Sequence, residues 1–103
     1  MAEEETNEEL KKWRDQINAV DAQIVPLLAK RLAAAKQIAQ VKYTHQLALT
    51  NRGREKEILE TLASSVNDET LAPYIRELYQ DVFLVSKQYQ AKVIKGLQDQ
   101  EKD

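Results

Sequence analysis

Arg31 lies in this sequence at a position where the surrounding pattern predicts an apolar residue. Apolar residues recur every three or four positions on both sides of it, at Leu10, Trp13, Ile17, Val20, Ile24, Leu27, Ala34, Ile38 and Val41. This spacing is typical of the seam of a long helix that packs on other helices. A guanidinium cannot lose its charge, and burying it without a counter-ion is very costly. Arg31 must therefore meet either a buried acid or an anion that arrives from solution, and we favour the anion.

Two further cations, Arg14 and Lys42, lie on the adjoining line of the same predicted helix. Arg31 and Lys42 are about 16 Å apart along the axis, so two long side chains can lean toward one small molecule between them. Arg14 is about 42 Å from Lys42, a span that no metabolite covers. Arg14 can thus serve only the pocket of a partner chain, beside that chain's Arg31, in an antiparallel dimer. The alternative for Arg14 is a surface ion pair with Asp15 or Asp21.

Ser86 and Gln90 interrupt an apolar stripe near the end of the chain in a similar way. They are one helical turn apart on a face that is otherwise apolar. Since buried polar groups need partners, we expect them to be neutral donors in the same polar pocket. Alternatively, Ser86 bonds back to its own helix and Gln90 bonds to a neighbour. Arg54 and Glu55 are placed to close one end of the pocket, although such residues at a helix start are usually solvated.

Three helices account for these positions, and we predict an all-α fold. The first runs from about Glu8 to Tyr43, and Pro26 should kink it without breaking it, because the apolar seam stays in phase on both sides. A helix of that length extends over about 50 Å, whereas a compact chain of this size has a radius of gyration of about 13 Å. A single three-helix chain cannot cover such a rod. We therefore predict an intertwined homodimer with a two-fold axis.

The two later helices are shorter. The middle one should run from about Arg52 to Ser64, with Thr50 or Asn51 as its N-cap. The last should open at Thr70 or Ala72, carry Pro73 in its first turn and fade near Leu97. Its core stripe should consist of Ile75, Leu78, Val82, Val85 and Tyr89.

Composition limits the kinds of protein that this chain can be. Its 103 residues are the usual length of one domain, and we expect a single domain over 1–103 with flexible tails at 1–8 and 98–103. Without cysteine there is no disulfide or thiolate metal site, and one histidine and two glycines form neither a His cluster nor a phosphate loop. A net charge of −2 gives no general attraction for nucleic acid. The acidic start and the lack of a long apolar run favour a cytoplasmic protein without a membrane segment.

Taken in order, these segments resemble the all-helical chorismate mutases, the small intertwined dimers of aromatic amino-acid biosynthesis. The resemblance extends from about Leu10 to Lys95, and each segment alone is unspecific, but the set in this order and spacing is specific. The segments are Trp13-Arg14-Asp15-Gln16-Ile17, Val20-Asp21, Leu27-Leu28-Ala29-Lys30-Arg31, Ile38-Ala39-Gln40-Val41-Lys42, Arg54-Glu55 and Ser86-Lys87-Gln88-Tyr89-Gln90.

The resemblance implies a role for each candidate residue. The arginines that match Arg31 and, from the partner chain, Arg14 hold the two carboxylates of the substrate, chorismate. The residues that match Lys42 and Gln90 hydrogen-bond its ether oxygen. Glu55 corresponds to a residue near the ring hydroxyl. The pocket is completed by the positions of Asn51, Arg54, Glu55 and Ser86.

The reaction of that family suits these residue types on chemical grounds. The pericyclic rearrangement of chorismate to prephenate needs no nucleophile, metal or cofactor. It needs a dianion held in a chair-like conformation, with positive charge and hydrogen-bond donors where the ether oxygen gains negative charge. Two arginines, a lysine and a glutamine are sufficient for that. A hydrolase or a dehydrogenase has no comparable support, because the sequence offers no plausible catalytic triad and no GxGxxG motif.

The sequence also departs from the family and leaves alternatives open. Family members often have an acid at the position of Asn51, so we expect reduced or retuned activity, and Pro26 is unusual in so long a helix.

One alternative is an isochorismate pyruvate lyase, which shares the fold and much of the pocket, although the match at Arg54-Glu55 favours the mutase. The others are a regulatory module that binds another shikimate-pathway enzyme and a purely structural helical dimer.

Overall fold

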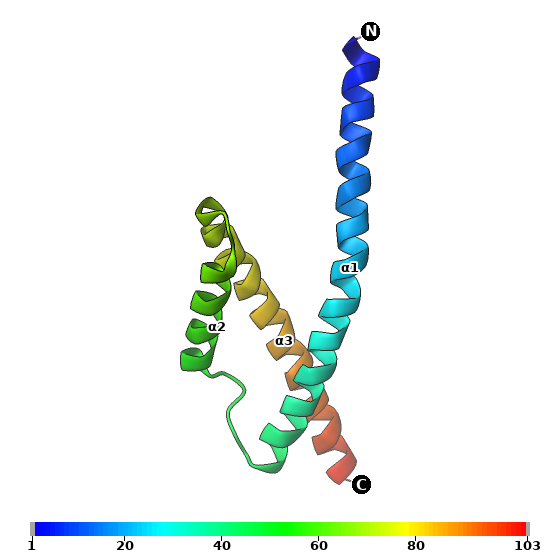
Figure 1. The fold of residues 1–103 in the computed structure, drawn as a ribbon. Helices are drawn as coiled ribbons and strands as arrows, with labels where there is room; N and C mark the ends of the chain where they lie inside the picture. Colours follow the sequence, from blue (N-terminus) through cyan, green and yellow to red (C-terminus); the bar gives the residue numbers. More distant parts are fainter. Residues whose placement is uncertain (1, 103) are drawn as a thin grey trace. The chain divides into compact units, whose positions relative to one another are not determined.

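The part of the chain that the structure describes, residues 2–102, folds into three α-helices and one short 3-10 helix, so the predicted all-α fold is confirmed. The structure is a computed structural model, and Met1 and Asp103, the outer ends of the two expected tails, lie outside the described residues. In chain order the elements are α1 (Ala2–Thr44), α2 (Arg52–Ser65), the 3-10 helix η1 (Glu69–Leu71) and α3 (Ala72–Glu101) (Figure 1).

The chain divides into two compact units, the first up to Ala33 and the second from Ala34 onward. The first unit is a single stretch of α1. It begins before the predicted start at Glu8, so the expected tail at 1–8 is helical in its described part. Residues 2–8 contain neither proline nor glycine, and acidic residues near a helix start interact favourably with the helix dipole. The apolar pattern therefore marks only part of the helix, and the helix itself starts earlier.

Pro26 lies inside α1, and the helix continues through it. Proline lacks the N–H that would complete one backbone hydrogen bond, but the helix on each side is long enough to retain its other bonds. The prediction that Pro26 does not break the helix is confirmed. The apolar seam of this unit is open in the single chain, with exposed fractions between 42% and 64% for Leu10, Trp13, Ile17, Val20, Ile24 and Leu27.

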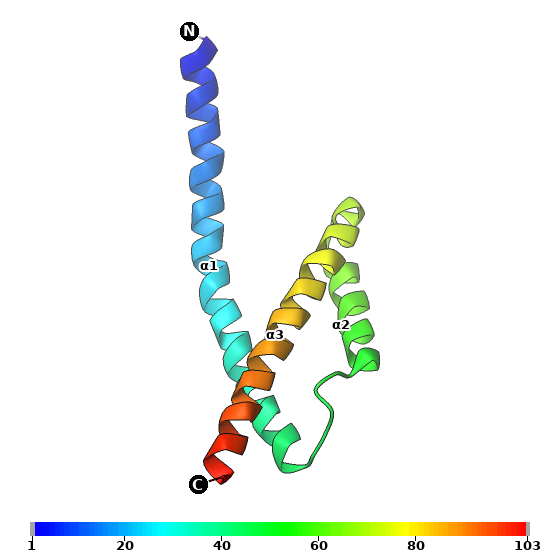
Figure 2. The same cartoon turned by 180° about the vertical axis from the view of Figure 1, so that it is seen from behind.

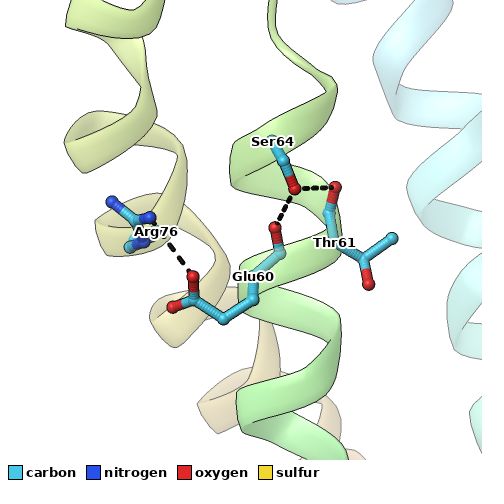
Figure 3. A network of polar contacts seen from close by, with 4 residues as sticks. All are labelled: Glu60, Thr61, Ser64 and Arg76. Carbon is cyan, nitrogen blue, oxygen red and sulfur yellow. Dashed lines mark hydrogen bonds and ion pairs between the residues drawn. The ribbon is translucent and has the colours of Figure 1, made fainter.

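In the second unit α2 and α3 lie side by side and run in opposite directions (Figures 1 and 2). Two ion pairs join them. Near the start of α2, the Nζ atom of Lys87 lies 2.9 Å from the Oε1 atom of Glu55. Further along α2, the Nη2 atom of Arg76 lies 3.4 Å from the Oε2 atom of Glu60 (Figure 3). The two contacts join the antiparallel helices at separate points.

The apolar core of the second unit is small. Ala63 of α2 and Phe83 of α3 are buried, and the ring of Tyr79 meets that of Phe83 edge-on, with centroids 6.1 Å apart. Ala35 and Ala39, one turn apart on the last part of α1, are also buried. Their small side chains let a neighbouring element approach the helix backbone closely.

Gln46, in the turn that follows α1, has the left-handed conformation, with φ at 55°. The N–H of Leu47 donates to the carbonyl oxygen of Lys42 over 2.8 Å, and the N–H of Gln46 donates to that of Tyr43 over 3.3 Å. This is the Schellman arrangement, which satisfies carbonyls that the last turn of a helix leaves without partners. Glycine is the usual residue at this position, because it lacks the Cβ atom that makes the left-handed conformation unfavourable.

Local capping starts the later elements. Asn51 is the N-cap of α2, where its Oδ1 atom accepts a hydrogen bond from the N–H of Arg54 over 3.0 Å. Pro73 lies in the first turn of α3, where its missing N–H costs no hydrogen bond. Both predictions are confirmed. The 3-10 helix η1 was not predicted; it is capped by Asp68, which accepts hydrogen bonds from the backbone N–H and the hydroxyl of Thr70.

α3 continues to Glu101, beyond the predicted end near Leu97, so the expected tail at 98–103 is helical in its described part apart from Lys102. The hydroxyl of Tyr43, in the last turn of α1, hydrogen-bonds the carboxylate of Glu101, and this bond raises the pKa of Tyr43. The contact ties the last turn of α3 to the last turn of α1.

The core stripe predicted for α3 is only partly buried. Leu78 and Val85 are 60% and 53% exposed, so the single chain does not bury these two members of the predicted stripe. The buried residues of α3 are instead Phe83, Ser86 and Gln90, on the adjoining face. Helical periodicity identifies an apolar face, but it does not tell whether the same chain or another molecule covers it.

Candidate active site

The central feature of the candidate site is a buried polar pair on α3. Ser86 and Gln90 are 5% and 7% exposed, and the Nε2 atom of Gln90 donates a hydrogen bond to the Oγ atom of Ser86 over 3.2 Å. The two residues predicted to share a polar pocket therefore contact each other directly. The alternative had Ser86 bonded back to its own helix and Gln90 bonded to a neighbour; the bond from Gln90 to Ser86 agrees with its second part, and the role of the pair in a pocket stays a prediction.

The amide oxygen of Gln90 is the unsatisfied atom of this pair within the described part of the chain. Among the described residues, no group donates a hydrogen bond to this buried Oε1 atom. An amide carries both a donor and an acceptor, and a hydroxyl can act as either. A half-turn of the amide would therefore let Ser86 donate to Oε1 and leave an N–H of Gln90 to point where the oxygen now lies. The pair can offer a ligand either an acceptor or a donor.

Lys42 is half-buried in the last turn of α1. Its Nζ atom donates a hydrogen bond to the carbonyl oxygen of Leu49 over 2.7 Å. The loop between α1 and α2 thus folds back against the lysine and holds its ammonium group. An ammonium has three N–H donors, so this bond leaves it able to bind an anion as well.

Glu55 lies in the first turn of α2, and its carboxylate reaches α3 through the ion pair with Lys87. The two side chains are 25% and 31% exposed, so the pair is partly shielded from water. Lys87 directly follows Ser86, so the ion pair places Glu55 beside the segment that carries the buried polar pair. Sequence reasoning assigned no role to Lys87, because only the register of the two helices shows that it meets Glu55.

Asn51 and Arg54 take local roles at the start of α2. Asn51 is exposed and uses its side-chain oxygen for the N-cap. The guanidinium of Arg54 lies 3.7 Å from the carboxylate of Glu57, with both side chains more than 60% exposed. In the single chain, therefore, the structure does not bring the guanidinium of Arg54 together with Ser86 and Gln90, and its place in the pocket stays a prediction.

Arg14 and Arg31 lie in the first unit. Arg14 is exposed, and Arg31 is half-buried. Asp15, one expected partner of Arg14, instead accepts a hydrogen bond of 2.9 Å from Lys11, and this bond raises the pKa of Lys11. The participation of both arginines in a shared pocket stays a prediction.

Comparisons with known proteins identify the family. The family described as chorismate mutase type II matches residues 13–91, a region that includes every candidate site residue. The bifunctional chorismate mutase/prephenate dehydratase of Buchnera aphidicola subsp. Acyrthosiphon pisum (strain APS) is 36% identical over 90 residues, which are 86% of this chain and 23% of that protein. The chain thus spans less than a quarter of the length of this relative.

No solved structure matches the chain significantly. Within residues 2–102, none of the helices is both long and apolar enough to cross a membrane. The resemblance seen in the sequence is confirmed by the match over residues 13–91, and the chain belongs to the type II chorismate mutase family.

Proposed function

We propose that the chain catalyses the rearrangement of chorismate to prephenate. The observation that carries the proposal is the buried Ser86–Gln90 pair, which leaves one strong hydrogen-bonding group of the amide without a partner among the described residues. A buried group of this kind lowers the stability of the fold unless a ligand forms a hydrogen bond with it. The family match over the same region supports chorismate as that ligand.

The proposed chemistry is electrostatic and conformational. The guanidinium groups of Arg31 and of the partner's Arg14 bind the two carboxylates and hold the substrate in a chair-like conformation. Lys42 and an N–H of Gln90 donate to the ether oxygen as its bond to carbon breaks and negative charge develops there. The remaining pocket is formed by Asn51, Arg54, Glu55 and Ser86. The proposal includes no cofactor and no metal.

A homodimer with shared sites is part of this proposal. The open apolar seam of α1 supports it, since a continuous row of half-exposed large apolar side chains marks an interaction surface. The exposed Leu78 and Val85 of α3 offer a second apolar surface for the partner chain. A second copy placed with two-fold symmetry would cover both surfaces in both chains and bring each Arg14 to the other chain's site.

The experiment that tests the function follows two substrates with the purified protein. Chorismate absorbance should fall as prephenate appears, while isochorismate should yield no pyruvate. Release of pyruvate from isochorismate, with chorismate unchanged, would instead favour the lyase. Unchanged chorismate and isochorismate would contradict catalysis of either kind.

The cytoplasmic location expected from the sequence belongs to the same proposal. Cell fractionation tests it, and the activity should appear in the cytosolic fraction.

A further inference from the structure

Lys87 is a charged residue of α3 that the proposed mechanism does not use. It pairs with Glu55 over 2.9 Å, and both side chains are half-buried. The other ion pair between α2 and α3, Arg76 with Glu60, is longer at 3.4 Å and more exposed. Exposed ion pairs contribute little to stability, whereas shielded ones strongly influence the charges around them. The Lys87–Glu55 pair is therefore the one that can affect a nearby ligand.

Glu55 poses an electrostatic problem for the proposed site. Chorismate is a dianion, so a carboxylate beside it repels the substrate unless a cation compensates. Lys87 is placed to do this, because its ammonium contacts one oxygen of Glu55 directly. A carboxylate can accept several hydrogen bonds, so Glu55 can still accept one from a substrate hydroxyl while it is paired.

We propose that Lys87 is a positioning residue, which cancels the charge of Glu55 toward the dianionic substrate and holds its carboxylate against α3. The inference rests on the proposed function. Lys87 itself does not touch the substrate. The groove between α2 and α3 around the pair is also lined by Arg52 and Lys56, whose exposed side chains are further cations near Glu55. They lie in open solvent, where screening weakens their effect.

The test compares Lys87→Met with Arg76→Met, since each variant breaks one ion pair between the same two helices. With Lys87→Met, the KM for chorismate should rise roughly tenfold while kcat changes little, because an uncompensated Glu55 repels the substrate on binding. With Arg76→Met, KM should stay within about twofold of the wild-type value, because an exposed pair contributes little. Lys87→Arg keeps the cation and should restore most of the affinity.

A second substitution separates compensation of charge from a merely structural role. In the Lys87→Met background, Glu55→Gln removes the uncompensated charge, so the KM of the double variant should fall below that of Lys87→Met. If Lys87 only joins the helices, removing Glu55 as well restores nothing. Should Lys87→Met lose helical content, Lys87→Gln serves in its place, since it keeps a polar side chain of similar length.

The outcomes are distinct from those that test the function. If the wild-type protein leaves chorismate unchanged, the proposed function fails and this inference fails with it. If the wild-type protein is active and Lys87→Met has an unchanged KM, the inference alone is overturned. An equal rise in KM for Arg76→Met, or no recovery in the double variant, overturns it too. A rise in KM confined to Lys87→Met, reversed by Glu55→Gln, supports it.

Discussion

The amide nitrogen of Gln90 donates a hydrogen bond of 3.2 Å to the hydroxyl of Ser86, one turn earlier on α3. Both side chains are buried, and the amide oxygen accepts no hydrogen bond from any residue that the structure describes. A buried polar atom without a partner costs about 1–3 kcal/mol. A hydrogen-bond donor from outside the described residues would satisfy this atom, in agreement with the ligand-binding role proposed for Gln90.

Gln90→Glu should confine activity to acid pH. A neutral amide can donate to the ether oxygen at any pH, so the wild-type profile should be fairly flat around neutrality. An ionised carboxylate only accepts hydrogen bonds and repels the developing negative charge, whereas a protonated one can donate. The pKa of an unperturbed glutamate is about 4.3, and burial raises it. The Gln90→Glu variant should therefore regain activity as the pH falls.

The pH profile of kcat checks this prediction, and the exposed Gln88 on the same helix provides the control. Gln88→Glu should keep the wild-type profile. If Gln90→Glu also keeps that profile through about pH 7–8, well above the ordinary carboxyl pKa, Gln90 does not face the ether oxygen.

Gln46→Gly should stabilise the protein. Gln46 has φ at 55°, and a residue with a Cβ atom pays a steric cost there that glycine does not. Part of the gain is offset because glycine makes the unfolded chain more flexible, which leaves an increase of about 0.5–1 kcal/mol in the free energy of unfolding. Urea unfolding at one fixed protein concentration measures it. Gln46→Ala, which keeps the Cβ atom, should show no such increase, and an equal gain would mean that φ at this position is not the cause.

Asp68 should make stability depend on pH in the acid range. Hydrogen bonds from Thr70 lower its pKa from the ordinary value of 3.8. The folded state thus prefers the ionised carboxylate. This contribution is fully present above the pKa of the unfolded chain and is lost as the pH falls through the lower pKa of the folded chain.

Thermal unfolding midpoints of wild type and Asp68→Asn at neutral and acid pH measure this effect. The asparagine keeps an acceptor for the cap of η1 but cannot ionise. The advantage of the wild type over the variant should be largest at neutral pH and should shrink below the ordinary pKa of 3.8. A difference that stays constant over that range would mean that Thr70 does not stabilise the ionised form.

The start of α2 and the first turn of α3 could be predicted because their signals are local. Asn51 caps through a bond within its own turn, and Pro73 is tolerated only where no N–H is needed. The outer ends of α1 and α3 were missed. Segments rich in Glu, Gln and Lys have good helix propensity, but they lack the apolar pattern by which a packed helix is recognised.

Part of the site could also be predicted, since Ser86 and Gln90 are polar residues on an apolar stripe and such residues need partners. The pairing of Lys87 with Glu55 could not be predicted from the sequence. The two residues are far apart in the sequence, and their contact depends on the register of the antiparallel helices. The exposure of Leu78 was missed for a related reason, because periodicity does not specify which chain covers a face.

The most direct test of the central claim, that two chains build each site for chorismate, is complementation between Arg14→Ala and Arg31→Ala. Each variant alone should form inactive dimers, because every site lacks one carboxylate-binding arginine. When equal amounts are unfolded and refolded together, mixed dimers contain one site with both arginines, and chorismate loss should recover to about a quarter of the wild-type rate. No recovery after co-refolding, or an Arg14→Ala protein that keeps the wild-type rate, would contradict the shared site.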